Sequence, residues 1–144
     1  MASFEKTFSL HVPSSTENLA MIRDFVTNIG VRAGLDEAQV MRLTLAVDEA
    51  CANVMEHAYG SEPVHEVTIR GELDNNEISF VIVDTGKHFD PAALESEPVE
   101  ELVRKRKSGG LGLRLIRTIM DDVQYRIIPG EKNELRMVKK LRRG

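Results

Sequence analysis

The hydrophobic period of this chain changes near Gly60, and that change limits the possible folds more than any other feature of the sequence. Before Gly60, apolar residues recur at helical spacing over residues 19–29 and again over 40–54, which predicts two amphipathic helices. After it, residues 67–73 and 77–84 predict two strands joined by a short turn. Helices and strands in this arrangement predict an α/β domain with helices packed on a sheet.

Further elements are expected on both sides of these segments. Residues 4–10 predict a short strand, and residues 14–17 (Ser-Ser-Thr-Glu) have the form of a capping box at a helix start. Near the C-terminus, a helix is expected over 111–120, followed by a strand pair over 123–128 and 135–141. The expected fold class is therefore an α/β sandwich, with a mixed, mostly antiparallel sheet and helices packed on one face.

The composition limits the class of protein but does not indicate its function. The chain has 144 residues, 42% hydrophobic and 29% charged, which fits one globular domain over residues 1–144. Its 19 Lys and Arg against 23 Asp and Glu give a net charge of −4, which argues against a broad nucleic-acid or membrane surface. One cysteine, Cys51, favours the reducing cytoplasm, and no signal peptide, membrane-spanning run or zinc-ligand spacing is visible.

Glu49, Asn53 and His57 are spaced four residues apart on the second predicted helix. Four residues advance a helix by about 400°, so the three side chains form one polar row at the edge of an apolar stripe. One interpretation is a solvated helix edge. The other is functional: Asn53 offers a carbonyl oxygen to Mg²⁺ beside phosphates and water, and Glu49 accepts a proton or positions a water. His57 is more typical of a structural residue, and Asp48 and Glu56, which lie off the row, are interpreted as solvent-facing or structural.

Asp84 ends the most apolar strand of the chain and is followed by Thr85 and Gly86. A carboxylate at that place needs a hydrogen-bond donor, and the amino group of an adenine base is one candidate. Gly86 has no Cβ and would let the backbone approach a flat ring closely. The alternative is an ordinary turn after a strand, where Asp-x-Gly is common.

A glycine cluster, Gly109-Gly110-Leu111-Gly112, leads into the predicted C-terminal helix. Free amides and the helix dipole could hold a phosphate chain there, and Lys107 and Ser108 add a cation and a hydroxyl. The cluster is neither a Walker A motif nor a dinucleotide-binding fingerprint, because the required residues do not follow it or the first strand. A flexible joint is the alternative. The irregular, charged residues 90–108 before it are interpreted as a functional or disordered loop.

The order of these motifs resembles the GHKL ATPase domain of histidine kinases, gyrase-type topoisomerases, ATP-driven chaperones and mismatch-repair proteins. Residues 45–60 resemble its N-box, 83–91 its first glycine box and 109–116 its second. The wording of residues 48–59 (Asp-Glu-Ala…Asn…Glu-His-Ala-Tyr) and the Phe-Asp-Pro tail of the first glycine box resemble more narrowly the bacterial anti-sigma-factor serine kinases. The resemblance covers residues 4–141.

The resemblance implies roles for individual residues. Glu49 would be the catalytic base and Asn53 the Mg²⁺ ligand, while Asp84 would bind the adenine amino group. Residues 90–108 would form a lid over the phosphates. Many relatives place a threonine near the adenine on the final hairpin, whereas residues 130–134 contain none, so no contact is assigned there. The implied nucleotide-binding set is Asn53, His57, Asp84, Gly86, Lys107, Ser108, Gly109, Gly110, Leu111, Gly112 and Leu113.

By the same resemblance, the expected activity is that of a Mg²⁺- and ATP-dependent protein serine/threonine kinase acting as an anti-sigma factor. It would phosphorylate a serine of a small anti-anti-sigma (STAS-type) protein and sequester a sigma factor as a cytoplasmic homodimer, without binding nucleic acid or a membrane. Two alternatives stay open. One is an ATP-regulated binding module that sequesters a partner without phosphoryl transfer, and the other is an α/β domain with no nucleotide site.

Overall fold

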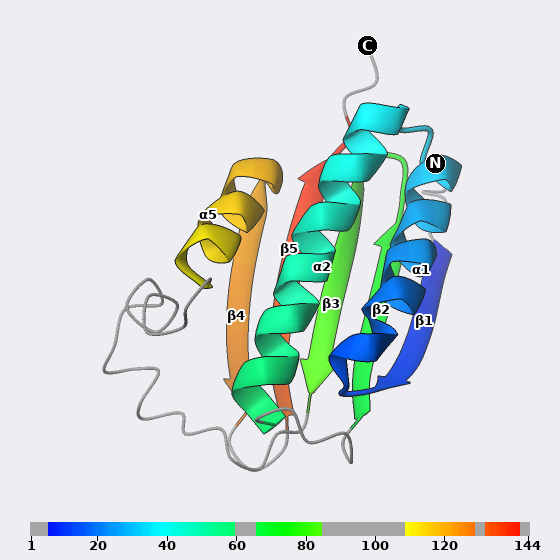
Figure 1. Ribbon diagram of the computed structural model, residues 1–144. Coiled ribbons are helices and arrows are strands. Elements are labelled where there is room, and N and C mark those ends of the chain that lie inside the picture. The colour runs from blue at the N-terminus through cyan, green and yellow to red at the C-terminus, as the bar shows by residue number, and fades with distance from the viewer. Residues whose placement is uncertain (1–5, 60–65, 85–108, 129–131, 142–144) are drawn as a thin grey trace.

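The computed structural model describes residues 6–59, 66–84, 109–128 and 132–141 (Figure 1). Five strands form one sheet in the order β1-β2-β3-β5-β4, and every neighbouring pair is antiparallel. The predicted α/β class is thereby confirmed, while no parallel pair of a mixed sheet is found among the described strands. The strands are β1 (Lys6–Pro13), β2 (Glu66–Leu73), β3 (Glu77–Asp84), β4 (Asp122–Ile128) and β5 (Lys132–Lys140).

Three α-helices in the described ranges cover one face of the sheet (Figure 1). They are α1 (Leu19–Arg32), α2 (Glu37–Tyr59) and α5 (Gly109–Ile119), and a 3-10 turn, η1 (Thr16–Asn18), precedes α1. The long helix α2 runs between the other two, with α1 on the β1 side and α5 on the β4 side (Figure 1). Helix α2 therefore has a neighbour on each side as well as the sheet beneath it.

The core lies between the helices and the sheet, as the two hydrophobic periods predict. Alternate strand residues point toward the helices, among them Ile69, Phe80 and Met137, which are fully buried. The stripe expected over residues 40–54 is buried along α2. Each large side chain buried in this way stabilises the fold by roughly 1.5–3 kcal/mol.

The starts of the two long helices differ from the prediction in one respect. At α2, Asp36 Oδ1 accepts a hydrogen bond from the Gln39 N–H at 2.8 Å, and Gln39 Oε1 accepts one from the Asp36 N–H at 3.0 Å. This reciprocal pair is a capping box. At α1, the capping box predicted over residues 14–17 was wrong, because the N-cap is Asn18 and it makes no side-chain cap. Asn18 Nδ2 instead donates to the Pro13 carbonyl oxygen at 3.0 Å.

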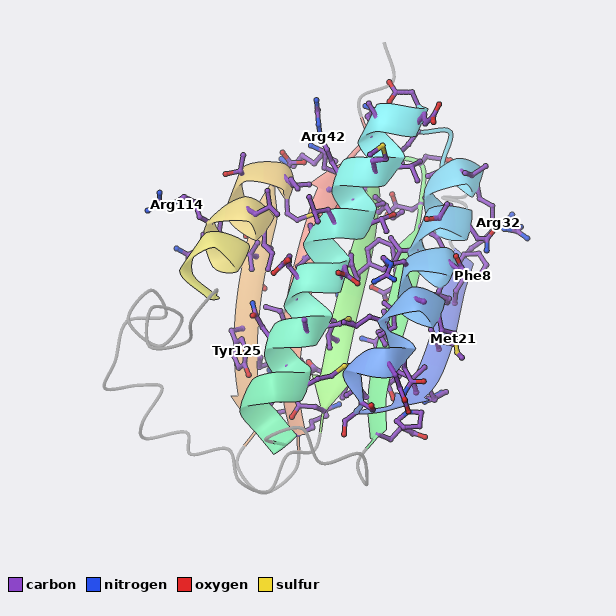
Figure 2. The ribbon with its side chains drawn as sticks, viewed as in Figure 1. Phe8, Met21, Arg32, Arg42, Arg114 and Tyr125 are labelled. Carbon is purple, nitrogen blue, oxygen red and sulfur yellow. The ribbon has the colours of Figure 1, made fainter. Side chains whose placement is uncertain are left out.

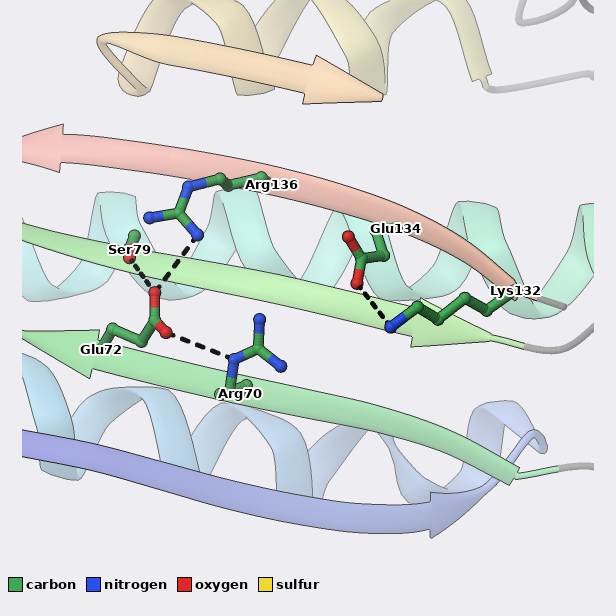
Figure 3. A network of polar contacts seen from close by, with 6 residues as sticks. All are labelled: Arg70, Glu72, Ser79, Lys132, Glu134 and Arg136. Carbon is green, nitrogen blue, oxygen red and sulfur yellow. Dashed lines mark hydrogen bonds and ion pairs between the residues drawn. The ribbon is translucent and has the colours of Figure 1, made fainter. Parts of the chain in front are cut away.

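The face of the sheet that carries no helix is covered by charged side chains (Figure 3). Glu72 Oε1 accepts hydrogen bonds from Ser79 Oγ at 3.3 Å and from Arg136 Nη1 at 3.2 Å. Glu72 Oε2 lies 3.4 Å from Arg70 Nε. Beneath this network Val81 is 1% exposed, so long charged side chains shield an apolar position on this face.

Helix α1 packs closely on the sheet because β2 has a glycine beneath it. A Cβ on Gly71 would lie 2.6 Å from Ile29 Cδ1 and 3.2 Å from Phe80 Cε1. The absence of a side chain at Gly71 lets Ile29 fill that space. Among the described residues, no helix is long and apolar enough to cross a membrane.

Replacing Gly71 by valine is expected to lower the free energy of unfolding by about 2 kcal/mol, since the added atoms overpack a filled core. Urea unfolding followed by circular dichroism measures this change. The matched control is Thr7→Val on the exposed edge strand, which should change stability by less than about 0.5 kcal/mol. Equal stability of Gly71→Val and the natural chain would show that α1 can shift away without cost.

Candidate functional site

Glu49 and Asn53 lie half-buried on the C-terminal half of α2. The buried stripe of α2 sets the rotation of the helix, and helical spacing then places both residues on the side of α2 toward α5. The backbone of His57 continues α2 beyond them, but its side chain lies outside the described residues. Two residues of the predicted row are therefore placed on one side of the helix.

Asp48 lies on the opposite side of α2 and has a structural partner. Its Oδ1 accepts a hydrogen bond from Arg23 Nη1 of α1 at 2.9 Å. The Arg23 side chain is 48% exposed and that of Asp48 is 19% exposed, so solvent screens the pair and its contribution to stability is modest. The structural interpretation of Asp48 is confirmed, and Glu49 next to it remains available to the α5 side.

Asp84 ends β3 and is buried, with 2% of its surface exposed. Its Oδ1 accepts a hydrogen bond from Asn133 Nδ2 at 3.0 Å. Asn133 is 5% exposed and lies directly opposite Asp84 in the β3–β5 register. The donor that a carboxylate at this strand end needs is thus supplied, at least in part, by a residue of β5.

Asn133 was not among the predicted site residues, because residues 130–134 were considered only for a threonine near the adenine. A signal was present, since Leu135 and Met137 mark the buried parity of β5 and Asn133 continues that parity. A polar residue at a buried strand position needs a partner. Asn133 presents its NH₂ group to Asp84 Oδ1, and this hydrogen bond sets the orientation of the Asn133 side chain.

The glycine cluster forms the beginning of a helix and not a loop before one. α5 begins at Gly109, two residues earlier than predicted, so Gly109, Gly110 and Gly112 fall in its first turn. The first amides of a helix have no partner within it, and the helix dipole adds partial positive charge there. The side chains of Leu111 and Leu113, and all of Gly86, Lys107 and Ser108, lie outside the described residues.

The described candidate residues gather toward one end of the fold. The C-terminal half of α2 and the C-terminal end of β3 lie at the same end in Figure 1. β5 begins there too, because Asn133 pairs with Asp84 across the sheet. The first turn of α5 lies beside α2 on the β4 side (Figure 1). This end therefore holds the C-terminal half of α2 and the buried Asp–Asn pair, while the first turn of α5 lies nearer the middle of α2 (Figure 1).

These residues fit a Mg²⁺–nucleotide complex. Among the described residues, no cluster of three or more His, Cys, Asp or Glu side chains could hold a metal ion. Mg²⁺ bound mainly by phosphate oxygens and water needs only one or two protein oxygens, and the half-buried Asn53 offers a neutral one. The three glycines of the first turn of α5 leave its amides unshielded by side chains.

Cys51 takes no part in this chemistry. It is fully buried in the core. Burial raises the pKa of its thiol far above the usual range, and the nearby charge of Asp48 adds to that effect. A thiol that stays protonated is a poor nucleophile, so Cys51 is a chemically inert part of the core.

Comparison with known families identifies the class of protein. Residues 12–139 match the model of the family described as histidine kinase-like ATPase domain. This match covers most of the chain and includes both the α2 row and the Asp84–Asn133 pair. The chain belongs to the histidine kinase-like ATPase domain family.

Two related proteins indicate which members of this family the chain is similar to. The chain is 35% identical over 132 residues to the serine-protein kinase RsbW of Bacillus cereus (strain G9842), covering 86% of this chain and 79% of that protein. It is 34% identical over 132 residues, with the same coverage, to the serine-protein kinase RsbW of Bacillus mycoides (strain KBAB4).

Two solved structures share the fold. One contains the RsbU and RsbW domains of Rv1364c from Mycobacterium tuberculosis, with a TM-score of 0.67 and 11% identity over 96% of this chain and 33% of that chain. The other is the SiaB–SiaC complex from Pseudomonas aeruginosa, with a TM-score of 0.64 and 16% identity over 91% of this chain and 88% of that chain. At these identities the likeness concerns the fold alone.

A double-mutant cycle tests whether Asp84 and Asn133 act as a pair. Asn133→Ala is expected to lower the free energy of unfolding by about 1–3 kcal/mol, because it removes a hydrogen bond to a buried carboxylate. Asp84→Ala should then cost less in the Asn133→Ala background than in the natural chain. Urea unfolding of the four proteins measures the difference, and strictly additive losses would show that the pair is not coupled.

Proposed function

We propose that this chain is a Mg²⁺- and ATP-dependent protein serine/threonine kinase that acts as an anti-sigma factor. The observation that carries the proposal is the placement of Glu49 and Asn53 on one side of α2, in a chain of the histidine kinase-like ATPase family. Its relatives at 35% identity are named serine-protein kinases, which supports the same reaction here.

In the proposed reaction, Glu49 accepts the proton of a serine hydroxyl on the partner protein. The serine oxygen forms a bond to the γ-phosphorus of ATP, and the bond from that phosphorus to the β–γ bridging oxygen breaks. The electron pair leaves with ADP. Phosphoryl transfer depends mainly on positioning and charge neutralisation, so a carboxylate held on a rigid helix suits the base role.

Other residues bind the nucleotide. Asp84, held by Asn133, accepts a hydrogen bond from the adenine amino group, and Gly86 lies beside the ring. The amides of Gly109 to Leu113, with Lys107 and Ser108, bind the phosphates. Mg²⁺, when bound, neutralises phosphate charge, and Asn53 supplies the protein oxygen that holds it.

The wider role follows the same proposal. The phosphate acceptor is a small anti-anti-sigma (STAS-type) protein, and the kinase sequesters a sigma factor as a homodimer in the cytoplasm. The SiaB–SiaC structure is a complex of a protein with this fold, which supports a partner-binding role for such domains. The alternative is an ATP-regulated module that captures partners. Such a module would bind ATP but would not transfer its γ-phosphate to a partner protein.

A transfer assay with γ-labelled ATP and candidate anti-anti-sigma proteins of the source genome tests the kinase reaction. Glu49→Gln is expected to slow transfer by roughly 100-fold or more, since general base catalysis contributes about that much. ATP affinity, measured by calorimetry, should change little. The matched control is Glu37→Gln, the same substitution at an exposed position in the first turn of α2.

Equal transfer rates in Glu49→Gln and Glu37→Gln would remove Glu49 from the base role. ATP binding without transfer to any candidate would favour the binding module. Absence of ATP binding would favour the α/β domain without a nucleotide site.

Asp84→Asn tests the adenine contact separately. Replacing the carboxylate by an amide puts an NH₂ group where an acceptor is needed, so ATP affinity is expected to fall about tenfold or more. Calorimetry with ATP and Mg²⁺ measures the change, and circular dichroism checks that the variant is folded. Unchanged affinity would show that Asp84 does not bind the base.

A further inference from the structure

A groove lies between α2 and α5, toward the N-terminal end of α2. Its volume is about 360 Å³. Leu43 and Leu45 of α2 and Leu115 and Ile119 of α5 contribute its apolar lining, together with Leu35 just before α2. The groove is therefore a hollow along the line where the two helices meet.

The apolar lining is only partly covered by the protein itself. Leu43 is 1% exposed and forms part of the core, but Leu45 keeps 44% of its surface exposed. Met41, one turn before Leu45 on α2, is 69% exposed. Exposed apolar side chains gathered beside a hollow are typical of a surface that contacts another molecule.

Two positively charged side chains, Arg42 and Lys139, line this groove. Arg42 is exposed, and within the described ranges its guanidinium has no hydrogen-bond or ion-pair partner; Figure 2 shows it projecting from α2 away from the fold. Lys139 Nζ is 3.8 Å from Asp121 Oδ2, which is a long ion pair. That same oxygen accepts a hydrogen bond from the Lys140 N–H at 2.7 Å. An apolar hollow with cations at its edge favours a partner with apolar and acidic side chains.

The groove continues toward the proposed catalytic carboxylate. Leu45 and Glu49 are four residues apart on α2, about 6 Å along the helix axis and on the same side of it. Arg42 lies on that side nearly one turn before Leu45. A cation, an apolar side chain and a carboxylate thus follow one another along α2. Since Glu49 repels carboxylates, an acidic segment lying there should have its charged end beside Arg42.

We propose that this groove docks the protein that accepts the phosphate. The docked segment places apolar side chains against Leu45 and Leu115 and acidic side chains beside Arg42 and Lys139. The adjoining part of the acceptor then lies toward Glu49. The identity of the acceptor rests on the proposed kinase function, whereas the docking surface itself requires neither ATP nor transfer.

Binding to the groove is tested first without nucleotide. The probe is a synthetic 18-residue helical peptide with a leucine stripe and glutamates at one end, and its counterpart carries lysines in place of the glutamates. In the full chain labelled on its methyl groups, the glutamate peptide is expected to shift the signals of Leu45, Leu115 and Ile119 saturably. Arg42→Glu should weaken this binding about tenfold and favour the lysine peptide.

The matched control is Arg126→Glu on β4, which changes the net charge equally at an exposed position outside the groove. It should change peptide affinity less than twofold. Equal weakening by Arg126→Glu and Arg42→Glu, shifts at other methyl groups, or no saturable shift would each overturn the docking surface. Circular dichroism of both variants separates these outcomes from unfolding.

Transfer kinetics then identify the occupant. With the acceptor found in the transfer assay, Arg42→Glu and Leu45→Ser are expected to raise the KM for the acceptor about tenfold, with kcat and the KM for ATP little changed. An unchanged KM for the acceptor would overturn its assignment to the groove while leaving the kinase reaction intact. Peptide binding at the groove in a chain that transfers no phosphate would instead overturn the proposed function and, with it, the acceptor as occupant.

Discussion

The burial of one face of α2 against the sheet governs the rest of the structure. Leu43, Val47 and Ala50 are at most 1% exposed on that face, and each large apolar side chain buried there contributes roughly 1.5–3 kcal/mol. A rotation of α2 that hid Glu49 or Asn53 would expose this stripe and bury polar groups instead. The helix therefore holds its polar row at the side toward α5, and the chemistry proposed for the chain depends on that rotation.

The two sides of α2 differ in how closely they pack against the neighbouring helix. Toward α1, Gly30 allows close approach, since a Cβ there would lie 3.2 Å from Val40 Cγ2, and the Arg23–Asp48 ion pair spans the two helices. Toward α5, the hollow beside Leu45 is left open. The close packing toward α1 holds α2 in place, and the side toward α5 leaves room for ligands and partners. Binding and catalytic residues are commonly held at an accessible surface by a rigid scaffold in this way.

Much of the fold and part of the candidate site could be predicted because the signals are local. Helical spacing placed Glu49 and Asn53 on one row, and strand alternation predicted β2 and β3 within one residue of their observed bounds. The start of α1 was mispredicted because a Ser-x-x-Glu pattern competes with other local hydrogen bonds, here from Asn18 to Pro13. The buried parity of Asn133 is also a local signal, but its partner Asp84 is 49 residues away and no local pattern identifies that contact.

Taken alone, the sequence determined the elements, the apolar stripes and the motif order, since these depend on residues a few positions apart. The tertiary structure alone decided the strand order β1-β2-β3-β5-β4, which brings Asn133 beside Asp84. It also decided that α5 lies against α2, which creates the groove beside Leu45. These contacts join segments far apart in the chain, and only the packing of helices on the sheet selects them from the many that local preferences allow.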